Sequence, residues 1–572
     1  MRVPLPLALL SIVPLVSALA PVVKKGSYLF DSTTGDRFYL KGVAYAANYG
    51  SGQATAVEES GSVSQLDPLA NGDGCTRDLP YFKELDINII RVYQVNASLD
   101  HSTCMSALNS AGIYVLLDLA TPYEAINSVN PSWNTELMTS YVETIEAFGS
   151  FENVFGFNIG NEVVSLLPLP PLVISGLILL QISSLPNDQA APYIKAAVRD
   201  IKTYLSAHNY SQLVGYTGTD SPNSRVTLPY YLACDEDESD IFDYWGINVY
   251  EFCGNSSFTA SGYQARTEEL QDLGIPAFFS EDGCISDPPR TFSDVPIIFG
   301  SEMTDVWSGV IMYEYIEQSN NYGLVNISSD GSSVATLTDF NYLKSQYATA
   351  TGSSLAEASY TPTISLPVSC PASNSSWPVA TALPPTPNSG ECACVASQLT
   401  CISTYTDGSS DIGTALGEIC GESSTACSSI AGNGTEGTYG DLSMCSPLQQ
   451  LNIAMDVYYN QQSRASSACA WSFATTTSVA GVTDTAAAAA ATSKCIAQDA
   501  FVGSTGIPSA TTTLPGATTQ PLVTVTSQSS TGASSSGHSS GAVPLLGAHI
   551  PVAAVFGSMV AGLVGGMVMA LL

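Results

Sequence analysis

The chain has 572 residues, too many for one ordinary domain, so we expect two or more folded parts joined by linkers. It carries 51 Asp and Glu against 17 Lys and Arg, a formal net charge of −34. Because an acidic surface repels phosphate backbones, this composition excludes nucleic acid as a partner. The low charged fraction, 12%, suits a protein that works among neutral polymers.

The N-terminus predicts secretion. Arg2 precedes an apolar run, Val3 to Val16, and small residues follow. This is the layout of a cleaved signal peptide, and the run is short for a membrane span of about 20 residues. We therefore assign residues 1–20 to a signal that is cut after Ala18 or Ala20, in preference to a membrane anchor.

Residues 21–369 alternate short β-rich runs with helix-like stretches, which include 134–148, 193–208 and 261–273. The eight expected strands are Gly42–Ala46, Ile87–Val95, Tyr114–Leu119, Val154–Gly160, Leu213–Thr217, Tyr244–Tyr250, Ala277–Ser280 and Ser308–Tyr315. This alternation predicts an α/β fold, a (β/α)8 TIM barrel, in which the chemistry gathers at the C-terminal ends of the strands.

Two of these strands end in glutamate. The fourth ends in Asn161-Glu162 and the seventh in Ser280-Glu281. Strands four and seven face each other across a barrel mouth, and retaining glycosidases use two carboxyl groups about 5–5.5 Å apart. Either residue alone is most simply an ordinary solvated acid. Together they favour catalysis, with Asn161 placed to bind a sugar 2-hydroxyl.

The remainder of the chain changes composition three times. Residues 370–390 are rich in Pro, Ser and Asn, as in a linker, and residues 391–502 form a small Cys-dense domain. Residues 503–541 form a Ser/Thr-rich stalk with too few apolar residues to fold. Residues 542–572 end in an apolar tail without basic residues, which favours a GPI-anchor signal over a transmembrane helix. The expected attachment site lies between Ser529 and Gly541.

The 14 cysteines fit the oxidising secretory route. Six are widely spaced and eight lie in the Cys-dense part, so both groups have the even number that disulfide pairing requires. With 4 His and no paired ligand spacing or phosphate-binding Gly loop, we expect no metal and no cofactor. Sequons for N-glycosylation, as in a secreted glycoprotein, begin at Asn96, Asn209, Asn255, Asn326, Asn374 and Asn433.

Five motifs carry a resemblance to a known family: Gly42-Val43-Ala44-Tyr45, Ile90-Arg91-Val92-Tyr93, Asn158-Ile159-Gly160-Asn161-Glu162, Asn248-Val249-Tyr250-Glu251-Phe252-Cys253-Gly254 and Phe279-Ser280-Glu281-Asp282-Gly283-Cys284. They resemble the fungal β-1,3-glucanosyltransferases of glycoside hydrolase family 72. The Cys-dense part resembles the family 43 carbohydrate-binding module found in one branch of these enzymes.

The resemblance implies a transferase that cleaves a β-1,3-glucan internally and joins the new end to a second glucan of the cell wall. It implies Glu162 as general acid/base and Glu281 as nucleophile. Residues that match sugar-contacting positions are Tyr93, Asp118, Tyr250, Tyr313 and Tyr322. A plain β-1,3-glucan hydrolase and an inactive glucan-binding wall protein remain as alternatives. We expect a monomer that meets glucan donor and acceptor at the cell surface, anchored to the plasma membrane.

The resemblance also implies disulfide pairs. In the barrel these are Cys75–Cys104, Cys234–Cys370 and Cys253–Cys284. For the Cys-dense part, where eight cysteines allow 105 pairings, the expected pairs are Cys392–Cys445, Cys394–Cys495, Cys401–Cys469 and Cys420–Cys427.

The chain departs from the family at two places. The family usually has Tyr after the nucleophile, where this chain has Asp282; on a strand that side chain points away from the face that carries Glu281. The second departure is an apolar, Pro-rich insert at residues 165–181, in a loop that is polar in the family. Its deletion joins Val164 to Ile182 and restores family-like spacing, so we favour a retained intron over a lid beside the acid/base.

Overall fold

The computed structural model describes residues 19–46, 67–121, 124–168, 172–174, 177–179, 184–222, 224–235 and 237–496. Most of the expected signal peptide, the stalk at 503–541 and the tail at 542–572 lie outside these residues. Within the described ranges, no helix is both long and apolar enough to span a membrane.

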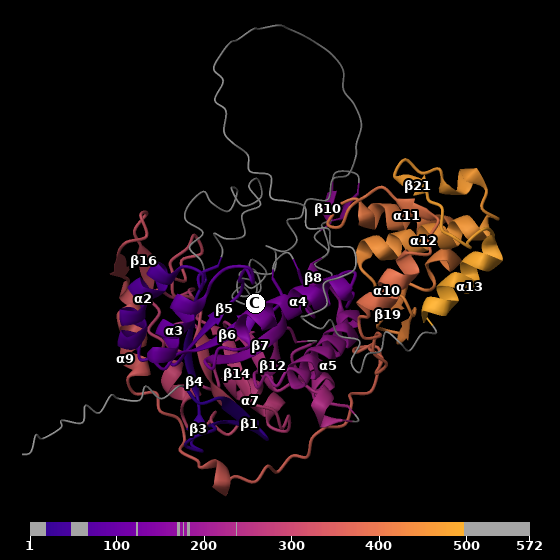
Figure 1. Cartoon of the computed structure of the whole chain (residues 1–572). Helices are drawn as coiled ribbons and strands as arrows, with labels where there is room; N and C mark the ends of the chain where they lie inside the picture. Colours follow the sequence, from indigo (N-terminus) through magenta and orange to yellow (C-terminus); the bar gives the residue numbers. More distant parts are fainter. Residues whose placement is uncertain are drawn as a thin grey trace, which may run out of the picture. The chain divides into compact units, whose positions relative to one another are not determined.

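Eight parallel strands close into a barrel in chain order, which confirms the predicted (β/α)8 fold (Figure 1). The strands are β4 (Leu40–Ala44), β5 (Ile89–Val92), β6 (Tyr114–Asp118), β7 (Val154–Asn161), β12 (Leu213–Thr219), β13 (Tyr244–Val249), β14 (Ala277–Asp282) and β15 (Trp307–Met312). The ring closes where β15 pairs with β4. Each strand is almost wholly buried, because helices cover the outer face while side chains fill the interior.

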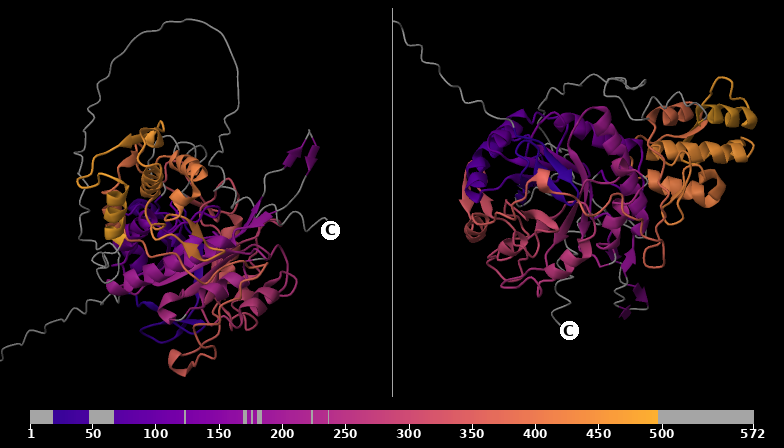
Figure 2. Two further views of the ribbon diagram at one scale, coloured as in Figure 1. Left: turned by 90° about the vertical axis from the view of Figure 1, so that its right-hand side faces the viewer. Right: turned by 90° about the horizontal axis from the view of Figure 1, so that it is seen from below.

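Helices surround the strands on the outside, as the views in Figure 2 show. They are α2 (Gly72–Leu85), α3 (Ser102–Ser110), α4 (Thr135–Phe148), α5 (Ala191–Ala207), α6 (Thr227–Leu232), α7 (Tyr263–Leu270), α8 (Val295–Ile298) and α9 (Thr338–Tyr347), with the 3₁₀ turns η2 (Asp188–Ala190), η3 (Glu238–Asp240) and η4 (Glu357–Ser359). The sequence explains how α4 begins: the Asn134 side chain accepts hydrogen bonds from the N–H groups of Glu136 and Leu137.

A small antiparallel sheet covers the N-terminal end of the barrel. It contains β1 (Val22–Lys25), β2 (Tyr28–Asp31) and β3 (Arg37–Phe38). Val22 and Leu29 share one apolar cluster with interior barrel side chains such as Leu40. This packing leaves the opposite end of the barrel, at the C-terminal ends of the eight strands, free for a site. A hairpin of β16 (Val325–Ile327) and β17 (Val334–Thr336) follows the eighth barrel strand.

The segment after β7, which contains the insert, forms two short antiparallel ladders. In the outer one β8 (Leu166–Pro168) pairs with β11 (Ser184–Pro186), and in the inner one β9 (Leu172–Ile174) pairs with β10 (Leu177–Leu179). The backbone therefore leaves the barrel and returns along itself.

The Cys-dense part has its own apolar core. Its elements are α10 (Ser389–Ala396), β18 (Cys401–Ser403), α11 (Ile412–Glu422), η5 (Ser424–Cys427), β19 (Gly432–Asn433), β20 (Thr438–Tyr439), α12 (Pro447–Gln461), η6 (Ser466–Cys469), β21 (Ala474–Thr476) and α13 (Thr485–Ile496). A capping box, formed by Ser446 and Gln449, begins α12.

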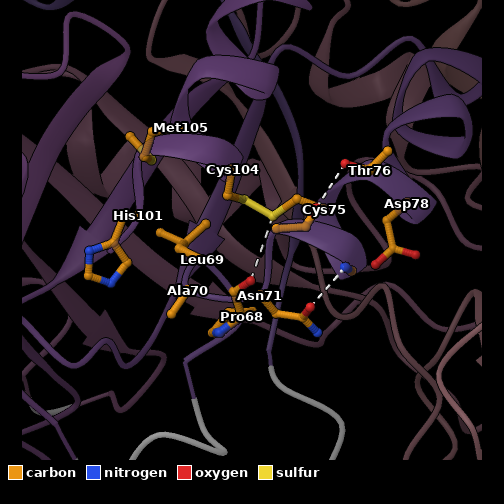
Figure 3. The surroundings of a disulfide bond; sticks show 12 residues. Pro68, Leu69, Ala70, Asn71, Cys75, Thr76, Asp78, His101, Cys104 and Met105 are labelled. Carbon is orange, nitrogen blue, oxygen red and sulfur yellow. Dashed lines mark hydrogen bonds between the residues drawn. A yellow bond between two sulfur atoms is a disulfide. The ribbon is translucent and has the colours of Figure 1, made fainter. Parts of the chain in front are cut away.

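Seven disulfide bonds join all 14 cysteines in the pairs implied by the family resemblance. Figure 3 shows the first, in which Cys75 of α2 meets Cys104 of α3 beside Leu69. Cys253–Cys284 ties the loop after β13 to the segment after β14, and Cys234–Cys370 ties residue 370 to the end of α6.

The segment 370–390, expected as a linker, packs against the barrel. Trp377 is buried and meets the Tyr231 ring edge-on at 5.7 Å between centroids. The Tyr231 hydroxyl donates to the Ala380 carbonyl at 2.8 Å. Composition alone did not reveal this anchoring, since it depends on a single buried tryptophan.

Candidate active site

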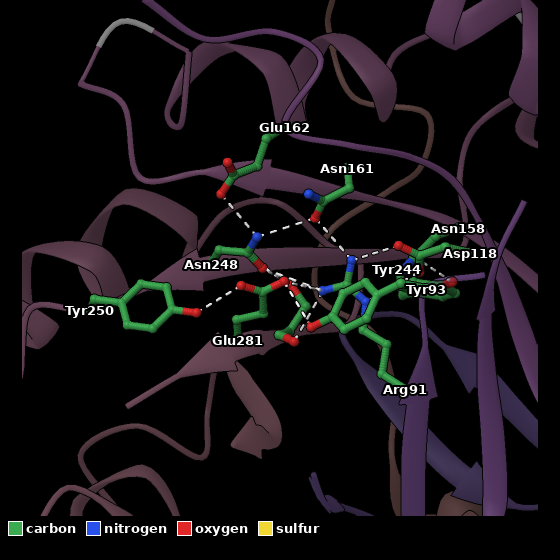
Figure 4. A network of polar contacts seen from close by, with 11 residues as sticks. Arg91, Tyr93, Asp118, Asn158, Asn161, Glu162, Tyr244, Asn248, Tyr250 and Glu281 are labelled. Atoms are coloured by element: carbon green, nitrogen blue, oxygen red, sulfur yellow. Dashed lines mark hydrogen bonds and ion pairs between the residues drawn. The ribbon is translucent and has the colours of Figure 1, made fainter. Parts of the chain in front are cut away.

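The two expected carboxylates lie at the same end of the barrel (Figure 4). Glu281 belongs to β14 and is 8% exposed, while Glu162 directly follows β7. Glu162 has a positive φ of 54°, and its N–H donates to the Thr217 carbonyl at 2.9 Å. A non-glycine residue in this conformation is strained and needs support from its surroundings, as functional residues often do.

Three donors surround the Glu281 carboxylate. The Tyr250 hydroxyl donates to Oε2 at 2.7 Å, the Tyr93 hydroxyl donates to Oε1 at 2.9 Å, and Arg91 lies 3.2 Å from Oε1. Burial, the largest effect, raises the pKa of Glu281 above its ordinary value, while the Arg91 charge and the two hydroxyls oppose this rise. These contacts favour the ionised form, which is the form a nucleophile needs.

Glu162 has a different environment. Its Oε1 accepts one hydrogen bond, from the Asn248 amide at 2.9 Å. Burial, followed by the charge of Glu281, raises the pKa of Glu162 to about 7, against smaller opposing effects of Asn248 and Arg91. The contacts of Glu281 thus favour an ionised carboxylate, whereas those of Glu162 favour a proton near neutrality, which is the division of roles between a nucleophile and a general acid.

Arg91 is the centre of this site, although the sequence analysis gave it no role. It is fully buried on β5 and donates to both carboxylate oxygens of Asp118, at 3.2 and 2.8 Å. It also donates to Asn161 Oδ1 at 2.9 Å and to Glu281. Its position was visible as the one charged residue in the apolar run Ile89-Ile90-Arg91-Val92, where burial is costly without partners.

Asn248 was also missed as a site residue. Its amide nitrogen donates to Glu162 and, at 3.2 Å, to Asn161 Oδ1, while its oxygen accepts from the Ser280 hydroxyl at 3.0 Å. These partners fix the amide orientation, so the nitrogen faces the acid/base. Asn248 belongs to one of the motifs that carry the family resemblance. The sequence alone did not reveal that its side chain contacts Glu162, because that contact depends on the fold.

A second layer supports Asp118. Asn158 donates to Asp118 Oδ1 at 2.6 Å, and the Tyr244 hydroxyl donates to Asn158 Oδ1 at 2.9 Å. Asp118 forms a buried ion pair with Arg91 in this structure, and the sugar contact that the resemblance implied stays a prediction.

The four expected tyrosines form a group beside Glu281. Ring centroids are 5.3 Å apart for Tyr313 and Tyr322, 5.7 Å for Tyr250 and Tyr322, and 6.4 Å for Tyr93 and Tyr313. The two ring planes of each pair are steeply inclined to one another, at 74°, 74° and 66°. The ring faces and the hydroxyl groups therefore point in different directions. Such a wall can pack against sugar rings and bond their hydroxyls.

A further carboxyl, Glu314, follows the eighth strand and was not expected. It is 1% exposed and accepts hydrogen bonds from the side chains of Gln318 and Asn320 at 2.7 and 2.8 Å. Burial raises the pKa of Glu314 to about 7. Glu314 lies next to this group of four tyrosines, because Tyr313 precedes it in the chain.

Asp282 points to the opposite face from Glu281, as its strand position predicted. The Tyr263 hydroxyl of α7 donates to Asp282 Oδ2 at 2.6 Å, and Asp282 is fully buried.

The two ends of the segment 164–187, which contains the insert, are held together. The Asn187 side chain donates to the Val163 carbonyl at 2.5 Å and accepts from the Ser165 N–H at 2.6 Å. Val164 N–H donates to the Tyr216 hydroxyl at 3.2 Å, which ties this clasp to the barrel. The backbone around Glu162 is therefore positioned by residues outside 166–186.

Comparison with known proteins identifies the two parts. A family profile described as Glucanosyltransferase matches residues 11–168 and 180–351, so that residues 169–179, within the insert, fall outside the match. A profile described as X8 domain matches residues 399–476.

Relatives of known name align along most of the chain. The 1,3-beta-glucanosyltransferase gas1 of Schizosaccharomyces pombe is 44% identical over 80% of this chain and 79% of its own length. The pH-responsive protein 1 of Candida albicans is 37% identical over 79% of both chains. The crystal structure of Saccharomyces cerevisiae Gas2p in complex with laminaritriose and laminaritetraose has a TM-score of 0.68 at 35% identity, covering 78% of this chain and 94% of that one.

Proposed function

The chain belongs to the glucanosyltransferase family, glycoside hydrolase family 72, and on that premise we propose that Glu281 and Glu162 are the nucleophile and the acid/base of its reaction. The protein is a retaining 1,3-β-glucanosyltransferase, which cleaves a β-1,3-glucan internally and transfers the new reducing end to the non-reducing end of another glucan. The contrast between the two carboxyl environments supports these roles.

In the first step, the ionised Glu281 carboxylate attacks the anomeric carbon of the donor glucan. The bond to the leaving sugar breaks, and protonated Glu162 gives its proton to the departing oxygen. The products are a glycosyl ester on Glu281, a released glucan fragment and an ionised Glu162. Arg91, Tyr93 and Tyr250 hold the attacking carboxylate in one orientation, which reduces the entropy lost at the transition state.

In the second step, Glu162 acts as a base. It takes the proton from the 3-hydroxyl of an acceptor glucan, whose oxygen attacks the anomeric carbon and displaces Glu281. A new β-1,3 bond forms and both carboxyl groups regain their starting protonation states. The loss of the Glu281 negative charge in the intermediate lowers the pKa of Glu162, because that charge is one of the causes that raise it.

Substitution of each carboxyl tests these roles separately. We expect Glu281→Ala and Glu162→Ala each to abolish transfer on a reduced laminari-oligosaccharide. Added azide, with a donor that carries an activated aryl leaving group and so departs without a proton, then distinguishes them: in Glu281→Ala it replaces the nucleophile and gives an α-glycosyl azide, whereas in Glu162→Ala it attacks the glycosyl-enzyme and gives a β-azide. Reversed anomers would overturn the assignment. Glu302→Gln, at an exposed glutamate, is the matched control.

The partition between transfer and hydrolysis is read from the size of the products. Oligosaccharides longer than the substrate indicate transfer, and only shorter ones would indicate a hydrolase. We propose that Tyr250, Tyr313 and Tyr322 bind glucan and favour a sugar over water as acceptor. Replacement of Tyr322 by Ala is expected to raise the proportion of hydrolysis.

We also propose the cellular setting of the enzyme. Residues 1–20 direct secretion, residues 391–502 bind glucan, and the tail at 542–572 is exchanged for a GPI anchor that keeps a monomeric, glycosylated enzyme at the plasma membrane and wall. Release of the enzyme from intact cells by a phosphatidylinositol-specific phospholipase tests the anchor. Persistence on the cells after this treatment would contradict it.

For the insert, we propose that residues 165–181 are a retained intron. The match to the family profile supports this, because it covers residues 11–168 and 180–351 and leaves out residues 169–179, within the insert. The transcript decides the question, since a spliced message that still encodes the insert would refute the proposal. The enzyme without these residues is expected to be active.

A further inference from the structure

A short loop after the eighth barrel strand carries two of the four tyrosines beside Glu281. Residues 313–324, which we call the tyrosine loop, connect β15 to β16. Tyr313 begins this loop and Tyr322 lies near its end, yet their ring centroids are 5.3 Å apart. The loop must therefore fold back on itself to bring the two rings together.

The buried Glu314 carboxylate lies inside this fold of the chain. Gln318 Nε2 donates to its Oε2 at 2.7 Å, and Asn320 Nδ2 donates to its Oε1 at 2.8 Å. Burial of a carboxyl group is costly unless it is hydrogen-bonded, and here both donors are neutral amides of the tyrosine loop itself. Glu314 thus ties the start of the loop to its middle.

Asn320 extends this tie to both tyrosines. Its Oδ1 accepts from the Tyr322 N–H at 3.3 Å, and its Nδ2 donates to the Tyr313 hydroxyl at 3.4 Å. The Glu314 N–H also donates to the Tyr322 carbonyl, at 3.1 Å. The backbone that carries the Tyr322 ring is therefore held by Glu314 directly and through Asn320.

Arg290 constrains a different part of the loop. Its guanidinium donates to the carbonyls of Tyr313 and Tyr322, at 2.7 and 2.5 Å, and is itself held by Asp339 at 2.8 Å. Arg290 thus meets backbone atoms near the two ends of the tyrosine loop, whereas the Glu314 side chain binds side chains from its middle. The two residues have separate effects on the loop.

The tyrosine loop meets the proposed nucleophile through Tyr250. The Tyr322 ring lies 5.7 Å from the Tyr250 ring, and the Tyr250 hydroxyl donates to Glu281 Oε2 at 2.7 Å. Within the described residues, Glu314 makes no hydrogen bond to Glu281 or Glu162. A change at Glu314 is therefore expected to move the rings and to leave the contacts of the two carboxylates intact.

We propose that Glu314 is a positioning residue for the acceptor glucan: it sets the spacing of the Tyr313 and Tyr322 rings, and thereby the preference of the glycosyl-enzyme for a glucan over water. The proposal rests on the proposed role of Tyr322 in acceptor binding. The ligand is the sugar ring of a neutral β-1,3-glucan, which packs against an aromatic face and bonds the phenol hydroxyl. Glu314 is buried and acts through the rings.

The partition of the glycosyl-enzyme tests this role. Transfer and hydrolysis start from the same intermediate, so their ratio is independent of the rate at which that intermediate forms. With the full-length enzyme and a reduced laminari-oligosaccharide as donor and acceptor, product sizes give the substrate concentration at which transfer equals hydrolysis. Glu314→Ala is expected to raise this concentration about tenfold, the most that one aromatic contact contributes. An unchanged value in the folded variant overturns the proposal.

Milder variants keep the test decisive if Glu314→Ala does not fold, as judged by circular dichroism. Asn320→Ala, at a partly exposed residue, removes one half of the tie and should raise hydrolysis in the same direction. An unchanged partition in this variant overturns the proposal. Glu314→Gln should retain most of the wild-type partition, because the Gln318 amide can turn to accept from the new amide. Ser319→Ala, at an exposed residue of the tyrosine loop, is the control.

Coupling to Tyr322 separates positioning from a purely stabilising role. In the Tyr322→Ala background, Glu314→Ala should change the partition less than about twofold, because the ring that it positions is already absent. Equal effects of Glu314→Ala in both backgrounds contradict the positioning role. If Tyr322→Ala alone leaves the partition unchanged, the proposed function of Tyr322 fails and this proposal fails with it. If Tyr322→Ala raises hydrolysis and Glu314→Ala does not, the positioning role alone is wrong.

Discussion

Replacement of Asn248 by leucine tests the control of the acid/base in this site. The Asn248 amide donates the hydrogen bond that Glu162 Oε1 accepts, at 2.9 Å, and this bond favours the ionised form of Glu162. Leucine has a similar volume but no donor. The perturbation therefore removes one stabilising contact to the charged form and leaves Glu162 in place.

The expected shift follows from the free energy of that contact. A hydrogen bond to a charged group contributes about 1.5–3 kcal/mol, and one pKa unit corresponds to about 1.4 kcal/mol. The pKa of Glu162, raised by burial to about 7, should rise by a further 1–2 units or so. Because the first step needs protonated Glu162, activity should persist to a correspondingly higher pH.

The assay is the pH dependence of kcat/KM for a reduced laminari-oligosaccharide, with products separated by size. Its alkaline limb reports the pKa of the acid in the free enzyme, as a property of the coupled carboxyl pair. Ser280→Ala is the matched control, since Ser280 contacts the Asn248 oxygen and not Glu162. An alkaline limb that stays in place, or moves to lower pH, would refute the reasoning about Glu162.

Three further results are expected. Tyr93→Phe or Tyr250→Phe removes one donor to the Glu281 carboxylate and should lower kcat/KM about 10- to 100-fold, measured in the same assay; an unchanged rate would show that the hydroxyl is dispensable. Arg91→Lys keeps the positive charge but removes the guanidinium hydrogen bond to the Glu281 carboxylate, so the acid limb of the pH profile should move to higher pH, and a shift to lower pH would contradict this sign. Replacement of Cys253 and Cys284 by serine opens a crosslink with a sequence separation of 31, and should lower the free energy of unfolding in urea by about 3–4 kcal/mol. A loss below about 1 kcal/mol would show that the reduced chain retains structure there.

The barrel could be predicted from the sequence because each strand is an apolar run between turn signals. All eight predicted strands overlap the observed ones, with boundaries that differ by a few residues, as for Ile87–Val95 against Ile89–Val92. The two glutamates could be predicted as partners since strand order alone brings strands four and seven across the mouth.

What the sequence did not predict depends on contacts between distant residues. Asn248 reaches Glu162 across 86 positions, and Arg91 reaches Glu281 across 190. No local pattern encodes which donor faces which carboxylate. The anchoring of Trp377 was missed for the opposite reason, since a polar composition concealed one buried ring. The ladders of the insert had no periodicity from which their pairing could be inferred.

The clasp at Asn187 has a consequence for engineering. Because its hydrogen bonds bring Val163 and Ser165 back to one point, the chain can carry extra residues there without a change in the barrel, and the entropy of loop closure grows only slowly with added length. The position three residues after Glu162 is therefore a natural graft point. A fluorescent reporter or a sugar-binding peptide inserted there would be displayed beside the proposed acid/base, Glu162.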